Sequence, residues 1–214
     1  MIRLHDYWRS GAAYRVRIAL ALKGVAFDRV AHDLRTGAQR AGAYRSLNPQ
    51  GLVPALETDG GDVLTQSPAI LEWLEETYPH PPLLPAAPGA RAVVRSMAAT
   101  IACDIHPLGN LRVQQALRGD FGADAEAVNR WIGRWIAEGF AALEAAIARH
   151  GGGFAFGDTP TLADCHLVPQ VYSAERHAVD LSPYPCLMAA ADRARALPAF
   201  AAAHPSVQPD ADRP

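Results

Sequence analysis

Three short motifs in the first third of the chain could bind a ligand through backbone groups or helix N-termini. Val53-Pro54 stands at the start of an apparent strand. Proline cannot donate a hydrogen bond to a neighbouring strand, so its position here calls for an explanation. If this peptide bond is cis, it turns the backbone of Val53 outward, and that backbone can pair with an extended peptide. An edge-strand proline is the simpler interpretation of the dipeptide alone.

The other two motifs stand at the starts of predicted helices. Gln66-Ser67 precedes Pro68, and a helix that begins there offers free N–H groups and a positive dipole end to a carboxylate. Ser10 precedes the first helix, where its hydroxyl and the helix dipole would stabilise a thiolate. Each serine is also explained as an ordinary helix cap. For Ser67 alone the cap is favoured, and for Ser10 both interpretations stay open.

The composition narrows the classes of function. Half of the 214 residues are hydrophobic, which is enough to bury a core, and the net charge is −2. This balance provides no basic field for nucleic acid or an anionic membrane, so arginines must bind any anion locally. No apolar run approaches the ~18 residues of a membrane span. The odd number of cysteines (Cys103, Cys165 and Cys186), the lack of a CxxC pair and the lack of a signal peptide predict a cytoplasmic protein.

The elements that would position these motifs follow the order βαβαββα in the first eighty residues. The predicted segments are a strand over 2–7, a helix from Ser10 to Gly24, a strand over 27–34, an ambiguous stretch over 36–47, a hairpin over 53–65 and a helix from Ser67 to Tyr78. Five prolines in residues 79–89 end regular structure. We therefore expect a first domain over 1–80, a linker over 81–89 and an all-helical domain over 90–214.

The second half has a helical pattern throughout. One apolar stripe has spacings of three and four residues and comprises Ile132, Ile136, Phe140, Leu143 and Ile147. Thr161 to Asp164 has the form of a capping box, and Pro169 follows inside the helix that it opens. Asp164-Cys165-His166 resembles a metal-ligand cluster, but adjacent helical residues point in different directions and no partner pair is evident, so we expect cap and core residues here. Cys103 and Cys186 are expected to be small buried residues.

Taken together, the chain resembles a glutathione transferase, and it is most similar to the zeta class. The matching stretches are Tyr7 to Ser10, Tyr14 to Leu20, Leu47 to Leu56, Gln66 to Glu76, Leu167 to Gln170, Ala174 to Arg176 and Val179 to Pro185. Val-Pro and Gln-Ser are common to many transferases. The arginine-rich first helix and the segment Ala174-Glu175-Arg176 are specific to this class, and the resemblance spans nearly the whole chain.

The resemblance implies a thioredoxin-like first domain that binds glutathione, an all-α second domain and a homodimer. It implies a glutathione-dependent cis–trans isomerase of a small unsaturated dicarboxylate, either maleylacetoacetate or maleylpyruvate. The implied catalytic residues are Ser10, Arg9 and Arg176, and the implied glutathione-binding residues are Ser10, Gln50, Val53, Pro54, Gln66 and Ser67. The implied substrate-binding residues are Arg9, His106, Arg112 and Arg176. His106 and Arg112 are expected on the first long helix of the second domain, which Pro107 can break, and His106 is equally well explained as a core residue.

One departure from the class bears on the chemistry. The class has Ser-Ser-Cys at the start of the first helix, and this chain has Ser10-Gly11-Ala12. No protein cysteine can act there, so glutathione must supply the sulfur. Three other functions compete: a general transferase that conjugates electrophiles, a non-catalytic interaction module on the same fold, and a dithiol redox enzyme. The missing CxxC argues against the last, and the retained Ser10, Gln66 and arginines argue against the second.

Overall fold

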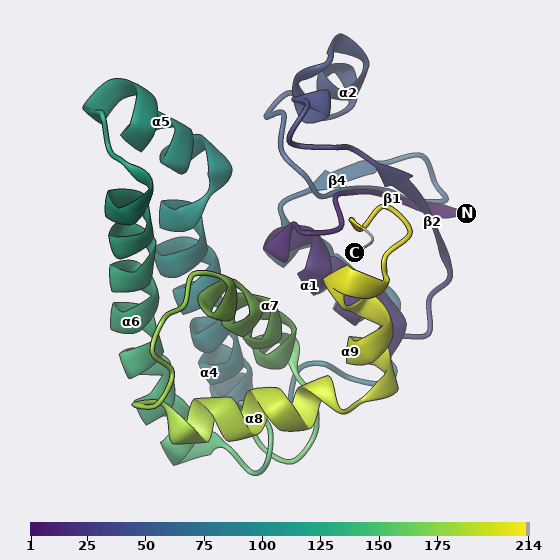
Figure 1. Cartoon of the computed structure of the whole chain (residues 1–214). Helices are drawn as coiled ribbons and strands as arrows, with labels where there is room; N and C mark the ends of the chain where they lie inside the picture. The colour runs from purple at the N-terminus through teal and green to yellow at the C-terminus, as the bar shows by residue number, and fades with distance from the viewer. Residues whose placement is uncertain (213–214) are drawn as a thin grey trace. The chain divides into compact units, whose positions relative to one another are not determined.

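The computed structural model describes residues 1–212, which form two compact units, one of residues 1–82 with 196–212 and one of Leu83–Arg195 (Figure 1). The first unit contains a four-stranded sheet in the order β2-β1-β3-β4. Its strands are β1 (Ile2–Asp6), β2 (Phe27–Ala31), β3 (Ala55–Glu57) and β4 (Val63–Thr65). β1 pairs in parallel with β2 and antiparallel with β3, and β3 pairs antiparallel with β4.

The first unit also contains four helices and two 3-10 turns within the described residues. They are α1 (Gly11–Leu22), the 3-10 turn η1 (Ala38–Arg40), α2 (Gly42–Leu47), α3 (Ser67–Thr77), α9 (Pro198–Ala203) and the 3-10 turn η4 (Pro205–Val207). Every residue from Ala13 to Leu20 in α1 is buried, because α1 packs against both α3 and α9. The predicted order βαβαββα is therefore present, and η1 and α2 occupy the stretch that the sequence left ambiguous.

Two local details of the first unit differ from the expectation or refine it. The Val53–Pro54 bond is cis, which the sequence left open. The third helix begins one residue earlier than expected: Ser67 is its first residue, and Gln66 takes the N-cap position with φ 67° and ψ 112°. Ser67 is thus not the cap. Positive φ in a non-glycine residue is uncommon and often marks a functional position.

The second unit is helical, as expected. Its elements are α4 (Pro88–Ala99), the π-helical turn η2 (Thr100–Ile105), the 3-10 turn η3 (His106–Gly109), α5 (Leu111–Phe121), α6 (Ala125–His150), α7 (Leu162–Arg176) and α8 (Pro185–Arg195). The predicted apolar stripe is the buried face of α6. The capping box of α7 is confirmed, with both reciprocal hydrogen bonds between Thr161 and Asp164 present. α7 is continuous through Pro169.

The expected single long helix at the start of the second unit is interrupted. Pro107 lies in the 3-10 turn η3, and Asn110 caps a new helix by accepting a hydrogen bond from the Arg112 backbone N–H. His106 and Arg112 therefore lie on different elements. The expectation for two cysteines is also wrong, because Cys103 and Cys186 are exposed and only Cys165 is buried.

The chain does not divide simply at the proline-rich segment. Leu83 and Leu84 are buried, and α4 begins at Pro88, inside the range expected to be a linker. Residues 196–212, expected in the helical domain, belong to the first unit because α9 packs on α1. Across residues 1–212, the structure contains no helix with the length and apolar character that crossing a membrane requires.

Candidate functional site

Ser10 lies in a tight turn between β1 and α1. The turn is closed by a hydrogen bond from the Ser10 backbone N–H to the Tyr7 carbonyl at 2.9 Å. Ser10 is the N-cap of α1, with extended backbone at φ −68° and ψ 117°, and its Oγ accepts a hydrogen bond from the Ala13 N–H at 3.3 Å. Because Oγ is the acceptor in that bond, the hydroxyl hydrogen is still available for donation. The predicted cap is confirmed, and its geometry also permits the binding role.

The two neighbours of Ser10 in this turn shape its surroundings. The guanidinium carbon of Arg9 lies 5.4 Å from the centre of the Trp8 ring, which holds this half-buried cation beside Ser10. Tyr7 is buried, and burial is the largest influence on its phenol and raises its pKa, while Arg9 lowers it. Tyr7 therefore remains a neutral phenol at neutral pH, and Arg9 is the cationic residue within the turn.

The start of α3 combines an unusual backbone with a pair of amide side chains. Gln66 has a positive φ, and its Nε2 donates a hydrogen bond to Oε1 of Gln50 at 2.8 Å. Both glutamine side chains are exposed, so each keeps polar atoms that can bind a ligand. The structure thus brings together two residues of the implied glutathione site that are separated by sixteen positions in the sequence.

Ser67 and Arg15 place a buried positive charge behind the first turn of α3. Ser67 is 3% exposed, and its Oγ accepts a hydrogen bond from Nη1 of Arg15 at 3.3 Å. Arg15 is itself 2% exposed, although it lies on α1. A buried guanidinium adds to the positive end of the α3 dipole, so the two favour a bound carboxylate at this terminus. The sequence shows an arginine-rich first helix, but nothing in it indicates this role of Arg15.

The loop that leads to the cis bond is held by a small set of hydrogen bonds. The Leu52 carbonyl accepts from Tyr44 Oη at 2.6 Å and from Asn48 Nδ2 at 2.8 Å. The Gln50 N–H donates to Oδ1 of Asn48 at 3.1 Å. These contacts fix the backbone on both sides of Gln50 and just before Val53. Val53 is half-buried and Pro54 is buried, immediately before β3.

The three candidate residues of the second unit lie on three separate elements. His106 is half-buried in η3, Arg112 is exposed in the first turn of α5, and Arg176 is the exposed last residue of α7. The guanidinium carbon of Arg176 lies 5.8 Å from the centre of the Tyr172 ring. The described residues contain no group of three or more His, Cys, Asp or Glu side chains that could hold a metal ion.

Comparisons with known proteins place this arrangement in a family. The family model described as "Glutathione S-transferase, N-terminal domain" matches residues 9–77, and "Glutathione S-transferase, C-terminal domain" matches residues 125–205. The curated maleylacetoacetate isomerase of Pseudomonas aeruginosa is 51% identical over 98% of this chain and 98% of its own length.

Two solved structures are similar over nearly the whole chain. A holo maleylpyruvate isomerase, described as a bacterial glutathione S-transferase of the zeta class, has a TM-score of 0.96 and 52% identity and covers 98% of this chain and 100% of its own. A maleylacetoacetate isomerase from Anaeromyxobacter dehalogenans with bound glutathione has a TM-score of 0.90 and 45% identity, and covers 99% and 98% of the two chains. The Ser10 turn, the α3 terminus and these full-length similarities agree, and the chain belongs to the zeta class of the glutathione S-transferase family.

Proposed function

We propose that this chain is a glutathione-dependent cis–trans isomerase of a small unsaturated dicarboxylate, with maleylacetoacetate as its substrate. The observation that carries the proposal is the geometry of Ser10, whose hydroxyl stands at the positive end of α1 and retains a hydrogen to donate. The similarity to isomerases along almost the full chain supports the reaction class.

The groups of the first unit fit glutathione, which is a tripeptide with two carboxylates. The α3 terminus with Ser67 and Arg15 suits one carboxylate, and Gln66 and Gln50 offer amide groups beside it. The Val53 backbone precedes the cis bond and can pair with the extended peptide. When bound, glutathione supplies a thiolate that adds to the double bond and leaves again after rotation, without net change.

The first task of the protein is to keep that thiol ionised at neutral pH. A thiol with a pKa of about 8.5 needs about 2.7 kcal/mol to reach a pKa near 6.5. A helix N-terminus contributes roughly 0.3–1 kcal/mol, and a hydrogen bond to a charged group about 1.5–3 kcal/mol. Ser10 and α1 supply both effects at one place, so no separate general base is needed.

The second task is to bind the substrate carboxylates and the negative charge that develops in the transition state. A dianion needs at least two fixed positive charges. Arg9 in the first unit and Arg176 in the second are the proposed pair, and Arg112 and His106 are further candidates for binding the substrate. An apolar detoxification site would not bear the desolvation cost of several cations.

Maleylpyruvate is the second candidate substrate, since it lacks only one methylene, which a pocket discriminates by about 1–3 kcal/mol. The relatives favour neither, with 51% identity to a maleylacetoacetate isomerase and 52% to a maleylpyruvate isomerase. We test the proposal by measuring kcat/KM for both dicarboxylates and for the neutral electrophile chlorodinitrobenzene. Faster conjugation of the neutral compound than isomerisation of either dicarboxylate would favour a general transferase instead.

Two further parts of the proposal concern the setting of the enzyme. We place it in the cytoplasm, because Cys103 and Cys186 are exposed free thiols and suit a reducing compartment. We also propose a homodimer, which is the assembly that the class resemblance implies. Exposed apolar side chains such as Val63, at the sheet-edge strand β4, are available to a second copy.

A further inference from the structure

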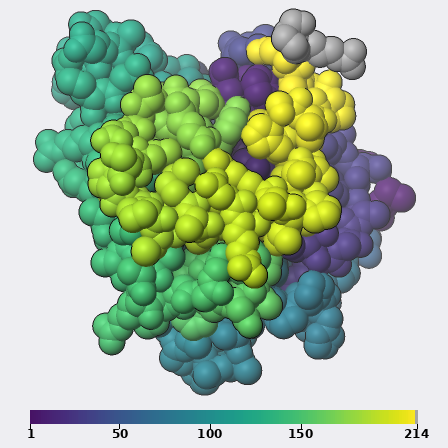
Figure 2. Space-filling view, turned by 60° about the horizontal axis from the view of Figure 1, so that its bottom comes forward, coloured from purple at the N-terminus to yellow at the C-terminus, as the bar shows by residue number. Residues whose placement is uncertain are grey.

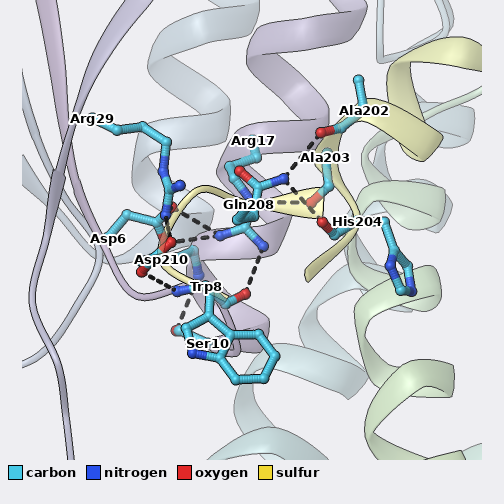
Figure 3. A network of polar contacts seen from close by, with 11 residues as sticks. Asp6, Trp8, Ser10, Arg17, Arg29, Ala202, Ala203, His204, Gln208 and Asp210 are labelled. Atoms are coloured by element: carbon cyan, nitrogen blue, oxygen red, sulfur yellow. Dashed lines mark hydrogen bonds and ion pairs between the residues drawn. The ribbon is translucent and has the colours of Figure 1, made fainter. Parts of the chain in front are cut away.

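The C-terminal segment of the first unit reaches back to the turn that carries Ser10. Oδ2 of Asp210 accepts a hydrogen bond from the Trp8 backbone N–H at 3.1 Å, across more than two hundred positions of sequence (Figure 3). Figure 2 shows the C-terminal part of the described chain, in yellow, at the surface beside purple residues from its beginning. Trp8 lies inside the turn that ends at Ser10, so Asp210 holds the backbone two residues before the Ser10 hydroxyl.

The carbonyl of the same residue is held from the other side. Nη2 of Arg17 donates to the Trp8 carbonyl at 2.9 Å. Arg17 is 2% exposed, and its remaining donors bind the Asp6 carboxylate at 2.8 and 2.9 Å and the Ala203 carbonyl at 3.0 Å. With every arm of the guanidinium engaged, Arg17 has little freedom to move. Both backbone polar groups of Trp8 are therefore fixed by side chains.

Arg29 joins the two carboxylates into one network. It donates from Nε to Asp6 at 2.8 Å and from Nη2 to Asp210 at 2.8 Å. Two arginines thus balance two aspartates, with Asp6 fully buried and Asp210 partly exposed. Burying such charges costs free energy unless good geometry and hydrogen bonds compensate. Hydrophobic residues in the same positions often stabilise a fold equally well. Among the contacts of the described residues, the network reaches the Tyr7–Ser10 turn at the backbone of Trp8.

The C-terminal segment does not depend on Asp210 alone for its position. Nε2 of Gln208 donates to the carbonyls of Ala202 and His204 at 3.0 and 2.9 Å, which folds the segment on itself (Figure 3). Asp212 forms a separate exposed ion pair with Arg35 at 2.8 Å. Removal of the Asp210 carboxylate consequently releases the Trp8 N–H and ends the contact with Arg29, while the contacts of Gln208 and Asp212 stay in place.

We propose that Asp210 is a positioning residue for Ser10, which acts through the Trp8 backbone to hold the serine hydroxyl where it stabilises the glutathione thiolate. The inference rests on the proposed role of Ser10. Two charged side chains hold the backbone of the turn, Arg17 from α1 and Asp210 from the C-terminal segment, and this backbone sets the position of the Ser10 hydroxyl. An error of about 1 Å in such a group reduces a rate by up to about a hundredfold.

The test compares Asp210→Ala with Asp212→Ala, a control on the same segment that does not touch Trp8. The pKa of the bound glutathione thiol is read from its ultraviolet thiolate absorbance over a pH series, together with kcat, KM for glutathione and Tm. For Asp210→Ala we expect a higher thiol pKa and a fall in kcat of about tenfold or more at neutral pH. KM for glutathione should change by less than about threefold, because the α3 terminus binds it separately. Asp212→Ala should match the parent.

A double-mutant cycle shows whether Asp210 acts through Ser10. In a Ser10→Ala background, Asp210→Ala should produce no additional change in thiol pKa, since the group that it positions is absent. Asp210→Asn keeps one oxygen acceptor for the Trp8 N–H and should recover part of the lost kcat. It replaces the alanine variant in the test if that variant does not fold. A lower Tm with unchanged kcat and thiol pKa would show a purely structural role and overturn the inference. A parent enzyme without glutathione-dependent activity would instead overturn the proposed function.

Discussion

At the residue scale, the left-handed backbone of Gln66 is the local feature with the clearest consequence for binding. Its φ of 67° is retained in a residue other than glycine, and its side chain pairs with that of Gln50. Strain of this kind persists where the surrounding structure enforces it, commonly in ligand sites. This geometry supports the proposal that the pair acts in the binding of glutathione rather than in the chemical step.

We expect Gln66→Ala to weaken glutathione binding by about twofold to tenfold, the value of one hydrogen bond of about 0.5–1.5 kcal/mol. Ser67→Ala should weaken it as well, because it removes the partner of Arg15 at the α3 terminus. Titration calorimetry measures the affinity, and kcat at saturating glutathione should remain near the parent value. Unchanged affinity in both variants would remove these residues from the site.

Arg176 tests the recognition of carboxylates. Loss of a charge-assisted contact of about 1.5–3 kcal/mol corresponds to roughly a tenfold to hundredfold change. Arg176→Met should reduce kcat/KM for the dicarboxylate by that factor and leave the slow conjugation of chlorodinitrobenzene nearly unaffected. Arg130→Met is a matched control, since Arg130 is exposed on α6 and pairs only with Glu126 in the described contacts. If Arg9→Met and Arg176→Met both preserve dicarboxylate turnover, the general transferase becomes the better account.

At the scale of elements, a pair of histidines links β1 to the end of β2. Nδ1 of His5 lies 2.9 Å from Nε2 of His32, and Nε2 of His5 lies 2.6 Å from the Glu57 carboxylate, which also pairs with Arg3. The His32 ring packs against Tyr44 of α2, with ring centres 4.3 Å apart. Only one proton fits between the two imidazoles, so charging both rings would place two N–H donors face to face.

Stability should therefore fall as the pH drops below about 6.5, the ordinary pKa of histidine. Burial lowers the pKa of His32, nearby His5 lowers it further, and Asp6 opposes them. The unfolded chain thus takes up the proton first, and stability is lost as the pH falls from 6.5 toward the lowered folded pKa. His32→Phe should flatten the decline in Tm between about pH 7 and 5. Burial raises the pKa of Asp164 to about 6, so only the difference between parent and variant is informative. A variant that declines as steeply as the parent would contradict this account.

The elements that the sequence predicted well carry local signals. The α6 stripe follows from spacing within one helix, and the caps at Ser10 and Thr161 follow from residues three positions apart. The sequence allowed a break at Pro107, which the structure shows, but the cap at Asn110 was not predicted, because its signal lies inside a pattern that continues as helix on both sides. The burial of Cys103 and Cys186 was predicted wrongly, since residue type alone does not say which face of a helix a residue occupies.

At the scale of the whole molecule, the contacts that the sequence could not predict join its two ends. Asp210 and Trp8 are far apart in sequence, and no periodicity or motif relates them. The same holds for Arg17 and the Ala203 carbonyl. The candidate site was predictable where class motifs carried it, at Ser10, Gln66 and Ser67. Its supporting charges (Asp6, Arg15, Arg29 and Asp210) were not, because only the tertiary fold brings them together.

The proposed homodimer is a prediction at this scale. The class resemblance implies it, and the sequence itself shows ample apolar helix surface. Light scattering of the purified chain at micromolar concentration should give twice the mass of 22.9 kDa. A single-chain mass that persists as the concentration is raised would contradict the dimer and leave the assignment of the Ser10 site unaffected.

The most direct test of the account is the dependence of isomerisation on both glutathione and Ser10. Dialysed enzyme should be inactive toward maleylacetoacetate and maleylpyruvate, and added glutathione should restore turnover of at least one of them without being consumed. Ser10→Ala should reduce kcat by about tenfold to a thousandfold with little change in glutathione affinity, as expected for a lost contact to a developing anion. Full activity of the dialysed enzyme without any added thiol, or an unchanged rate in Ser10→Ala, would contradict the account.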